Sequence, residues 1–237
     1  RFPGAVVAVS EGVRGELAKA LRLSSARLRH IPNPLVTSTR AMDADATALA
    51  EEMPRGYLLA VGRLDRHTKG FDILIAAYAA LPAPRPGLVI VGDGPDRSAI
   101  EVDIARAGVD GEVALTGWVR DPRPFYRRAS AFVLASRYEG WSNVLMEAMG
   151  EGCLVVATCC PYGPAEILGP DLVGWLVPPE DVASLTHSMQ YALSRSDAER
   201  DAVSASLRAR VQRFAADKVA LQWTELAMSI AHGKAQS

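Results

Sequence analysis

Short apolar runs separated by helical patterns organise most of the chain. Six such runs stand at Tyr57–Gly62, Gly87–Gly92, Glu112–Gly117, Ala131–Ala135, Cys153–Ala157 and Gly174–Val177. They are mostly continuous rather than alternating, which is typical of strands buried on both faces. Between them, apolar residues recur at three- and four-residue intervals, as in Leu74, Ala77, Tyr78 and Leu81, which predicts amphipathic helices. This alternation predicts an α/β fold with a Rossmann-like, doubly wound parallel sheet and helices on both faces.

The first part of the chain departs from this pattern. Residues 5–30 predict one strand (AVVAVS) and one helix, Gly12–Leu21. The segment Ile31–Pro34 follows as a rigid linker, because each proline fixes its own φ and restrains its neighbour. A single βα unit cannot bury its faces. We therefore expect residues 1–37 to be the tail of a preceding domain with its linker.

The last part of the chain carries only helical patterns. Residues 38–195 are expected to form the main, nucleotide-sugar-binding domain discussed below, and residues 196–237 a separate set of carboxyl-terminal helices. The final helix, predicted around Asp217–Ile230, aligns four apolar side chains on one stripe: Val219, Trp223, Leu226 and Ile230. Such a stripe needs a partner surface.

Composition and charge exclude several classes of protein. The 26 Lys and Arg residues against 27 Asp and Glu give a net charge of −1, which provides no electrostatic footprint for nucleic acid. No apolar run approaches the roughly 20 residues of a transmembrane helix. Cys153, Cys159 and Cys160 form neither a disulfide framework nor a CxxC metal motif. We therefore expect a cytoplasmic protein with reduced thiols.

Ligands of doubly wound sheets bind at the carboxyl ends of the strands, so candidate chemistry is expected just after each apolar run. After the first of these runs, Gly62 permits close approach of the backbone to a ligand, and Arg63 and Lys69 contribute two cations. Arginine offers a fork that matches phosphate oxygens, and lysine offers a point charge. Taken alone, this spacing fits two solvated surface cations equally well.

A second candidate segment follows the run Ala131–Ala135. Glu139 comes just after that run, and Val144–Glu151 reads as a helix that Asn143 would cap. The first free amides of such a helix, those of Val144, Leu145 and Met146, would then favour an anion such as a diphosphate.

Glu147 lies about one turn inside this helix. A carboxylate there is placed to accept hydrogen bonds from neighbouring hydroxyls of a sugar, as an acid does for ribose in dinucleotide-binding folds. The alternative is a residue that interacts only with the helix dipole.

These segments together resemble a known family. Glu139 and Glu147, with seven residues between them in SRYEGWSNVLMEAMGEG, resemble the signature of retaining glycosyltransferases of the GT-B fold, family 4. VGRLDRHTKGFDILIAAY, VGDGPDRSAIE, LTGWVRDPRPFY and GPAEI…GWLVPPED resemble that family's carboxyl-terminal half, in its order. AVVAVSEGV and IPNP resemble its last amino-domain segment and interdomain linker, so the resemblance covers residues 5–195.

The resemblance implies a nucleotide-sugar site. Arg63 and Lys69 match the pair that neutralises the donor diphosphate, Glu147 the carboxylate that holds the ribose, and Glu139 the one that contacts sugar hydroxyls. The matching main-chain positions are Gly62 beside the phosphates, Val119 at the base, Gly140, Trp141 and Ser142 around the sugar, and Asn143 and Val144 under the distal phosphate. Ser142 replaces the expected proline or glycine, which leaves the sugar open.

The implied activity is transfer of a hexosyl unit from a UDP- or GDP-sugar to an acceptor hydroxyl with retention of configuration. The acceptor would be a glycan, a lipid-linked molecule or a small molecule. No metal or other cofactor is implied. The acceptor site and general base would come from the amino-terminal domain, the part through which peripheral membrane association is expected. The resemblance also implies that the helices of residues 196–237 cross back to that domain. The chain alone is therefore expected to be inactive.

Other interpretations of the sequence remain open or are disfavoured. A non-catalytic module that binds a nucleotide or nucleotide-sugar would use the same residues. An NAD-dependent oxidoreductase is disfavoured, because Arg97 replaces the third glycine after Gly92-Asp93-Gly94. Spacing alone does not place Glu139 and Glu147 at a glycosidase separation. Asp43-Ala44-Asp45 reads as a solvated helical face rather than a metal motif.

Overall fold

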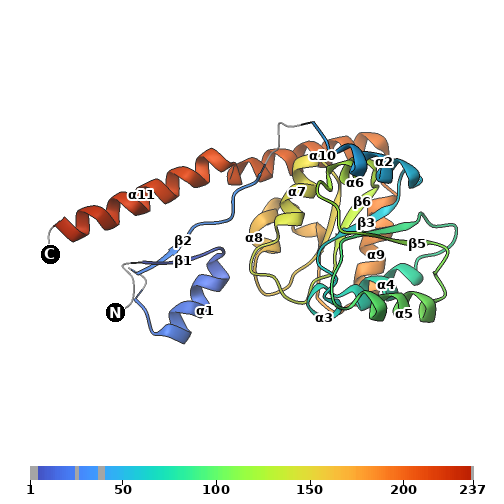
Figure 1. Ribbon diagram of the computed structural model, residues 1–237, viewed down its shortest axis with the longest axis horizontal. Coiled ribbons are helices and arrows are strands. Elements are labelled where there is room, and N and C mark those ends of the chain that lie inside the picture. The colour runs from blue at the N-terminus through green and yellow to red at the C-terminus, as the bar shows by residue number, and fades with distance from the viewer. Residues whose placement is uncertain (1–4, 25–26, 37–40, 236–237) are drawn as a thin grey trace.

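The computed structural model describes residues 5–24, 27–36 and 41–235. Its main body is a six-stranded, wholly parallel sheet (Figure 1). The strands are β3 (Leu58–Val61), β4 (Leu88–Val91), β5 (Val113–Gly117), β6 (Ala131–Leu134), β7 (Val155–Thr158) and β8 (Leu176–Val177). Each lies within or next to a predicted apolar run. All residues of β4, β6 and β7 are buried, as continuous rather than alternating hydrophobicity predicted.

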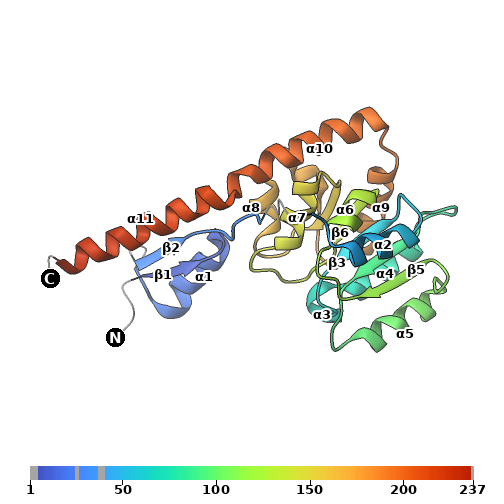
Figure 2. The same ribbon diagram turned by 45° about the horizontal axis from the view of Figure 1, so that its top comes forward.

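Helices cover both faces of this sheet, which confirms the doubly wound arrangement (Figures 1 and 2). One layer contains α2 (Ala44–Glu52), α6 (Arg123–Arg128), α7 (Asn143–Glu151) and α10 (Asp197–Val211). The opposite layer contains α4 (Phe71–Ala79), α5 (Arg97–Ala107) and α9 (Val182–Leu193). The short helices α3 (Arg66–Lys69), α8 (Pro164–Leu168) and η2 (Pro170–Trp175) lie in the connections.

The order of the strands determines where a ligand can bind. The sheet runs β5-β4-β3-β6-β7-β8, so the chain moves outward from β3 to one edge and then restarts at β6 beside β3. This is the strand order of dinucleotide-binding folds, whose ligands lie outside the carboxyl ends of the strands where the order reverses. The loops that follow β3 and β6 are therefore the expected position of a site.

A second, smaller sheet lies at the amino-terminal end of the chain. It pairs β1 (Val6–Ala8) with β2 (Leu28–His30) in parallel, and α1 (Glu11–Leu21) connects the two strands. The expectation of one strand and one helix was therefore incomplete. The missed strand is three residues long and contains an arginine and a histidine, so it carries no apolar run that could identify it.

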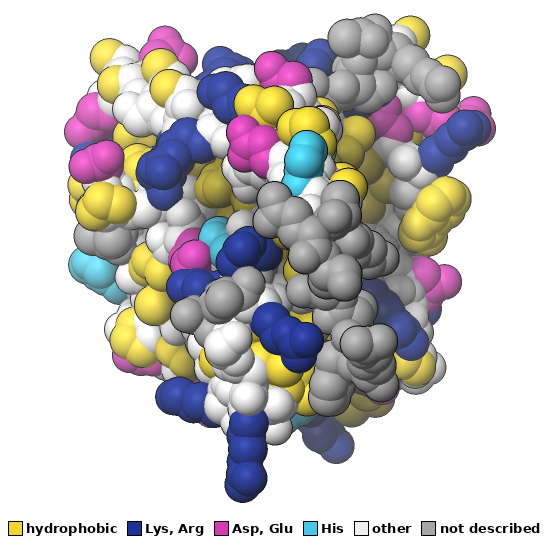
Figure 3. All heavy atoms as spheres, turned by 90° about the vertical axis from the view of Figure 1, so that its left-hand side faces the viewer, with side chains coloured by type: hydrophobic (Ala, Val, Ile, Leu, Met, Phe, Trp, Pro, Cys, Tyr) yellow, Lys and Arg dark blue, Asp and Glu magenta, His cyan; other side chains and the backbone are white. Residues whose placement is uncertain are grey.

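The carboxyl-terminal helix α11 (Ala216–Ala235) packs on this small sheet, on the face opposite α1 (Figures 1 and 2). Its stripe is only partly covered. Val219 and Leu226 are buried against Ile31, whereas Trp223 is 49% exposed. The end of the molecule with both termini, seen face-on in Figure 3, intersperses basic and apolar side chains.

Within the described ranges, the helices are too short or too polar to cross a membrane. The thiols of Cys153 and Cys160 are buried and that of Cys159 is exposed, and all three are free.

Candidate functional site

Two cavities flank the point where the strand order reverses. One of about 420 Å³ lies at the ends of β3, β4 and β5; its lining includes Gly62, Arg63, Gly92, Asp93, Trp118 and Val119. Another of about 600 Å³ lies between α1 and the loops after β3, β6 and β7; its lining includes Glu16, Lys69, Tyr138, Glu139, Gly140 and Tyr162. Six of the residues predicted for a nucleotide-sugar site line these two cavities: Gly62, Arg63, Lys69, Val119, Glu139 and Gly140.

Arg63 lies at the mouth of the first cavity, directly after β3. Its side chain is exposed, and no described residue accepts a hydrogen bond from its guanidinium or pairs with it at ion-pair distance. Asp65, two residues on, is close enough for the Arg63 charge to help lower its carboxyl pKa, after the larger effect of its hydrogen bonds from Thr68. The guanidinium is therefore available to an anionic ligand.

Lys69 and Glu139 meet directly. Lys69 Nζ lies 2.8 Å from Glu139 Oε1, and the Ser136 hydroxyl donates to the same oxygen at 2.8 Å. The side chain of Glu139 is 6% exposed and that of Lys69 is 27% exposed. Lysine and glutamate come from the loops after β3 and β6, the two central strands. The Lys69 charge is thus directed at Glu139.

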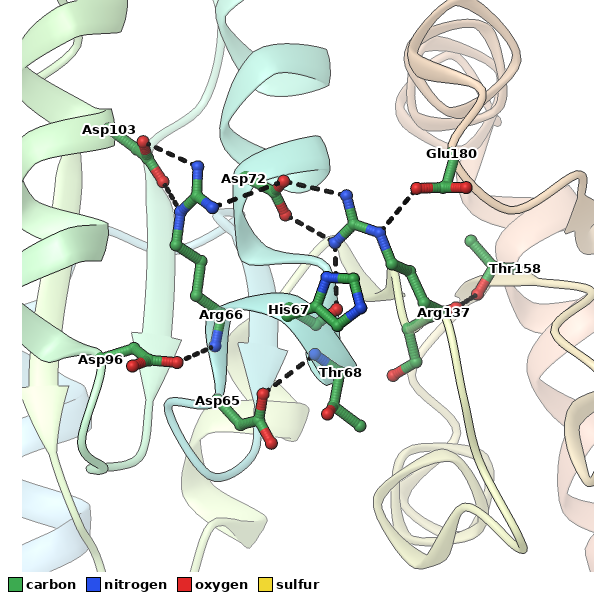
Figure 4. Close-up of polar contacts among 11 residues, drawn as sticks. Asp65, Arg66, His67, Thr68, Asp72, Asp96, Asp103, Arg137, Thr158 and Glu180 are labelled. Carbon is green, nitrogen blue, oxygen red and sulfur yellow. Dashed lines mark hydrogen bonds and ion pairs between the residues drawn. The ribbon is translucent and has the colours of Figure 1, made fainter.

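A network of side chains fixes the turn that carries Lys69 (Figure 4). Arg137 donates from its backbone amide to Thr68 O at 3.0 Å and from Nη1 to His67 O at 3.0 Å. The same guanidinium forms a two-pronged pair with Asp72, at 2.8 and 2.9 Å, and a third contact with Glu180. The loop after β6 is thereby fastened to the loop after β3.

The network keeps the carboxyl group of Asp72 ionised. Burial alone would raise the pKa of the Asp72 carboxyl, but the hydrogen bonds and charge of Arg137, with help from Arg66, hold that pKa below its usual value. Arg66 also pairs with Asp103, and its backbone amide donates to Asp96 (Figure 4). These contacts hold α3 against α5.

The amino-terminal end of α7 corrects one prediction. The helix begins at Asn143 with Ser142 as the N-cap residue, rather than at Val144 with Asn143 as the cap. Met146 N donates to Ser142 O, so the amides that precede the helical ladder are those of Asn143, Val144 and Leu145. The Asn143 side chain is engaged elsewhere, because its Oδ1 accepts from Asn33 Nδ2 at 3.1 Å.

The remaining loop positions differ in what they offer a ligand. Trp141 is anchored in the core: its ring packs edge-on against Phe214 at 5.0 Å. Only the main chain of Trp141 is therefore left for a sugar pocket. Gly140 is exposed and lines the second cavity, while Ser142 is buried and its Oγ has no partner among the described residues.

Glu147 points toward α6 from the first half of α7. The Tyr126 hydroxyl donates to Glu147 Oε2 at 3.2 Å. Burial raises the pKa of the Glu147 carboxyl, the Tyr126 hydrogen bond opposes that rise, and the charge of Asp121 adds to it. If Glu147 interacted only with the helix dipole, it would not need the buried Tyr126 hydroxyl as a partner.

Three residues that line the cavities were not singled out as site residues in the sequence. Trp118, which is 73% exposed at the rim of the first cavity, lies directly after β5 and just past the predicted apolar run Glu112–Gly117. Glu16 and Tyr162 face the second cavity from α1 and from the loop after β7. The position directly after a parallel strand could have identified Trp118, but no local pattern identifies the other two.

The chain was compared with known proteins. The family model of glycosyl transferases group 1 matches residues 55–195. The chain belongs to this family. The N-acetylgalactosamine-N,N'-diacetylbacillosaminyl-diphospho-undecaprenol 4-alpha-N-acetylgalactosaminyltransferase of Campylobacter jejuni is 32% identical over 164 residues, 69% of this chain and 44% of that protein. The lipopolysaccharide 1,6-galactosyltransferase of Escherichia coli K12 is 25% identical over 208 residues, 85% of this chain and 56% of that protein.

Solved structures give the same result for the fold of this group 1 chain. Sucrose-phosphate synthase from Thermosynechococcus elongatus superimposes with a TM-score of 0.82 at 28% identity, over 97% of this chain and 59% of that one. HepE of Anabaena, in complex with UDP, has a TM-score of 0.82 at 23% identity, over 97% and 65%. These neighbours are GT-B glycosyltransferases, whose Rossmann-like domains the six-stranded sheet matches. The chain spans about half the length of the curated relatives named above.

The motifs Asp43-Ala44-Asp45 and Gly92-Asp93-Gly94 have structural roles in this fold. Asp43 is the N-cap of α2, with its Oδ1 accepting from Ala46 N at 3.0 Å, and Asp45 follows in the first turn. Gly92 has φ +145°, and a Cβ there would overlap the carbonyl oxygen of Gly62, so this glycine allows two loops to touch. Among the described residues, no three His, Cys, Asp or Glu side chains cluster as metal ligands.

Proposed function

We propose that this chain is the donor-binding half of a retaining glycosyltransferase. It would bind a UDP- or GDP-sugar and serve transfer of the hexosyl unit to a hydroxyl of a glycan, lipid-linked or small-molecule acceptor. The observation that carries the proposal is that Lys69 and Glu139 pair directly while Arg63 lies exposed at the first cavity, on the loops after β3 and β6 where the strand order reverses. Cations, free amides and carboxylates in that arrangement suit a diphosphate flanked by two sugars.

The donor would extend along the carboxyl edge of the sheet. The base would occupy the cavity beside Val119, and the transferred sugar the cavity beside Glu139. The diphosphate would then lie between Arg63, Lys69 and the amides of α7, and the ribose within reach of Glu147. Support comes from HepE, a fold neighbour solved with UDP and with UDP-glucose.

The chemical task of these residues is to stabilise the departing nucleoside diphosphate. When the bond from the anomeric carbon to the phosphate oxygen breaks, negative charge grows on the diphosphate. Fixed cations and amides directed at that charge lower the barrier, and they supply the positive potential that a metal ion would otherwise provide. We therefore propose a reaction without a metal or other cofactor, in which Arg63 and Lys69 act on the leaving group.

In this proposal the Lys69 ammonium also serves the diphosphate. Its ammonium is paired with Glu139 at 2.8 Å, so a bound diphosphate would compete for it. Glu139 would keep the Ser136 hydroxyl and gain the hydroxyls of the sugar. In this proposal Glu139 orients the sugar and is not a glycosidase-type general base.

The small sheet and α11 would belong to the acceptor side. Together with the rest of an amino-terminal domain, they would supply the acceptor site, the general base and any peripheral membrane contact of a cytoplasmic enzyme. The chain by itself would then bind donor without transferring sugar, because positioning of the second reactant alone can account for about 7–11 kcal/mol of a barrier.

Calorimetric titration of the chain with UDP, GDP, UDP-glucose and NAD tests the proposal. We expect a nucleoside diphosphate or its sugar to bind and NAD not to bind. Glu147→Gln should weaken binding of the ribonucleotide more than that of its 2′-deoxy analogue. A chain that binds none of the diphosphates contradicts the proposal. The alternative, a non-catalytic binding module, is favoured if donor binds but no transfer occurs with the amino-terminal half added.

A further inference from the structure

We propose that Tyr126 is a positioning residue for the ribose of the donor. Its hydroxyl donates to Glu147 Oε2 at 3.2 Å, which leaves Oε1 to accept from the ribose hydroxyls. This inference rests on the proposed function, because it requires Glu147 to be the carboxylate that binds ribose. It adds a residue of α6 that would act through Glu147 rather than touch the ligand.

The ring of Tyr126 is held rigidly. It is 1% exposed, and it packs edge-on against Phe132 of β6 with the ring centroids 5.7 Å apart. A packed aromatic ring fixes the position of its hydroxyl, whereas a glutamate side chain has three rotatable bonds. Anchoring one carboxylate oxygen therefore removes rotamer freedom from Glu147 before the ligand arrives, which is how preorganisation increases affinity.

The same hydrogen bond acts on the charge of Glu147. Burial raises the pKa of that carboxyl, and the negative charge of Asp121, from the loop before α6, raises it further. Asp121 is itself paired with Arg123, and Glu151 lies one turn farther along α7. Of these groups, the Tyr126 hydroxyl is the one that hydrogen-bonds to the ionised carboxylate and so favours it.

The ionised form is the one that serves a sugar. A carboxylate accepts at both oxygens, whereas a protonated carboxyl must use one oxygen as a donor. The Tyr126 hydroxyl cannot itself take over as the charged group, because burial raises the pKa of this tyrosine well above 10. Tyr126 would thus orient Glu147 and keep it able to accept from both ribose hydroxyls.

The test compares two buried tyrosines. Tyr126→Phe removes only the hydroxyl that reaches Glu147. Tyr57→Phe is the control, because Tyr57 is about equally buried and its hydroxyl donates to Phe125 O at 3.0 Å and not to Glu147. Binding of UDP and of 2′-deoxy-UDP is measured by calorimetry between pH 5 and pH 8, with thermal melts of each variant.

We expect Tyr126→Phe to reduce the preference for UDP over 2′-deoxy-UDP about three- to tenfold, the effect of one hydrogen bond. Its loss of UDP affinity on acidification should also begin at a higher pH than in the wild type, since Glu147 would then protonate earlier. Tyr57→Phe should lower the melting temperature to a similar degree but leave the preference and the pH profile unchanged.

The outcomes separate the two proposals. A wild-type chain without preference for the ribonucleotide, or a Glu147→Gln variant that keeps it, refutes the ribose role itself. If Glu147→Gln loses the preference and a folded Tyr126→Phe retains both it and the wild-type pH profile, the role of Tyr126 is refuted. The double variant Tyr126→Phe/Glu147→Gln gives an independent check: with Glu147 replaced, loss of the Tyr126 hydroxyl should reduce the preference no further.

Discussion

Removing the Arg63 side chain is the sharpest test of the proposal that this site binds a diphosphate. The guanidinium is exposed at the first cavity and makes no hydrogen bond to a described residue, so Arg63→Ala removes a potential ligand contact and little else. Surface substitutions of this kind change the free energy of unfolding by less than about 0.5 kcal/mol. A loss of binding can therefore be attributed to the missing contact.

The expected size of that loss follows from the chemistry. A hydrogen bond between charged partners contributes about 1.5–3 kcal/mol to the free energy of binding. Its loss should raise the dissociation constant about tenfold to hundredfold. UDP and GDP should lose this much, and uridine and guanosine almost nothing. Because the group is exposed, the difference should shrink as salt is raised from about 0.05 to 0.5 M, where screening is stronger.

Calorimetry with the four ligands at two salt concentrations measures this directly. Arg106→Ala is the matched control, since Arg106 is also exposed but lies in the last turn of α5, outside both cavities. It should bind every ligand like the wild type. Equal losses for nucleoside and diphosphate in Arg63→Ala, or equal losses in the two arginine variants, would refute the assignment of Arg63 to the phosphates.

Two further predictions concern the base and the network around α3. Trp118→Ala should weaken the binding of UDP and of uridine alike by about 1–3 kcal/mol, the value of one aromatic–base stack, and leave pyrophosphate binding unchanged. Fluorescence titration measures this, with Trp223→Ala on α11 as the control. Equal affinities in the two variants would contradict the prediction. Asp72→Asn should lower the stability of the fold at pH 7, and the variant should lose less stability than the wild type as the pH falls. Asp72 has a lowered pKa when folded, so its contribution is full above about pH 5 and is lost as the pH falls through that lowered value. Melts from pH 7 to pH 2 that parallel the wild type would argue against it.

The sheet could be predicted from the sequence because its signal is local. A strand buried on both faces must be apolar at each position, and β4, β6 and β7 satisfy this over four residues each. The small sheet shows the limit of that signal. β2 has one buried residue in three, so its pairing with β1 depends on the connection through α1 rather than on its own composition.

The details of the site depend on contacts between distant residues, which no local pattern encodes. Ser142 and Asn143 are both good cap residues, so spacing alone could not choose between them. In the structure Ser142 is the cap, and the side chain of Asn143 instead accepts a hydrogen bond from Asn33, 110 positions earlier. Likewise, the partner of Glu147 is a tyrosine 21 positions away on a neighbouring helix. The sequence could nominate Glu147 but not what holds it.

The contact between α1 and the main domain changes how the second cavity should be understood. Glu166 of α8 accepts from the backbone amides of Glu11 and Gly12, at 2.9 and 3.2 Å, so a carboxylate of the main domain caps the start of α1. A side chain at position 12 would overlap the ring of Tyr162, which is why the contact requires glycine there. With α1 held in this way, Glu16 lies across the cavity from the Lys69–Glu139 pair. α1 therefore forms part of the wall of the second cavity, together with the loops after β3, β6 and β7.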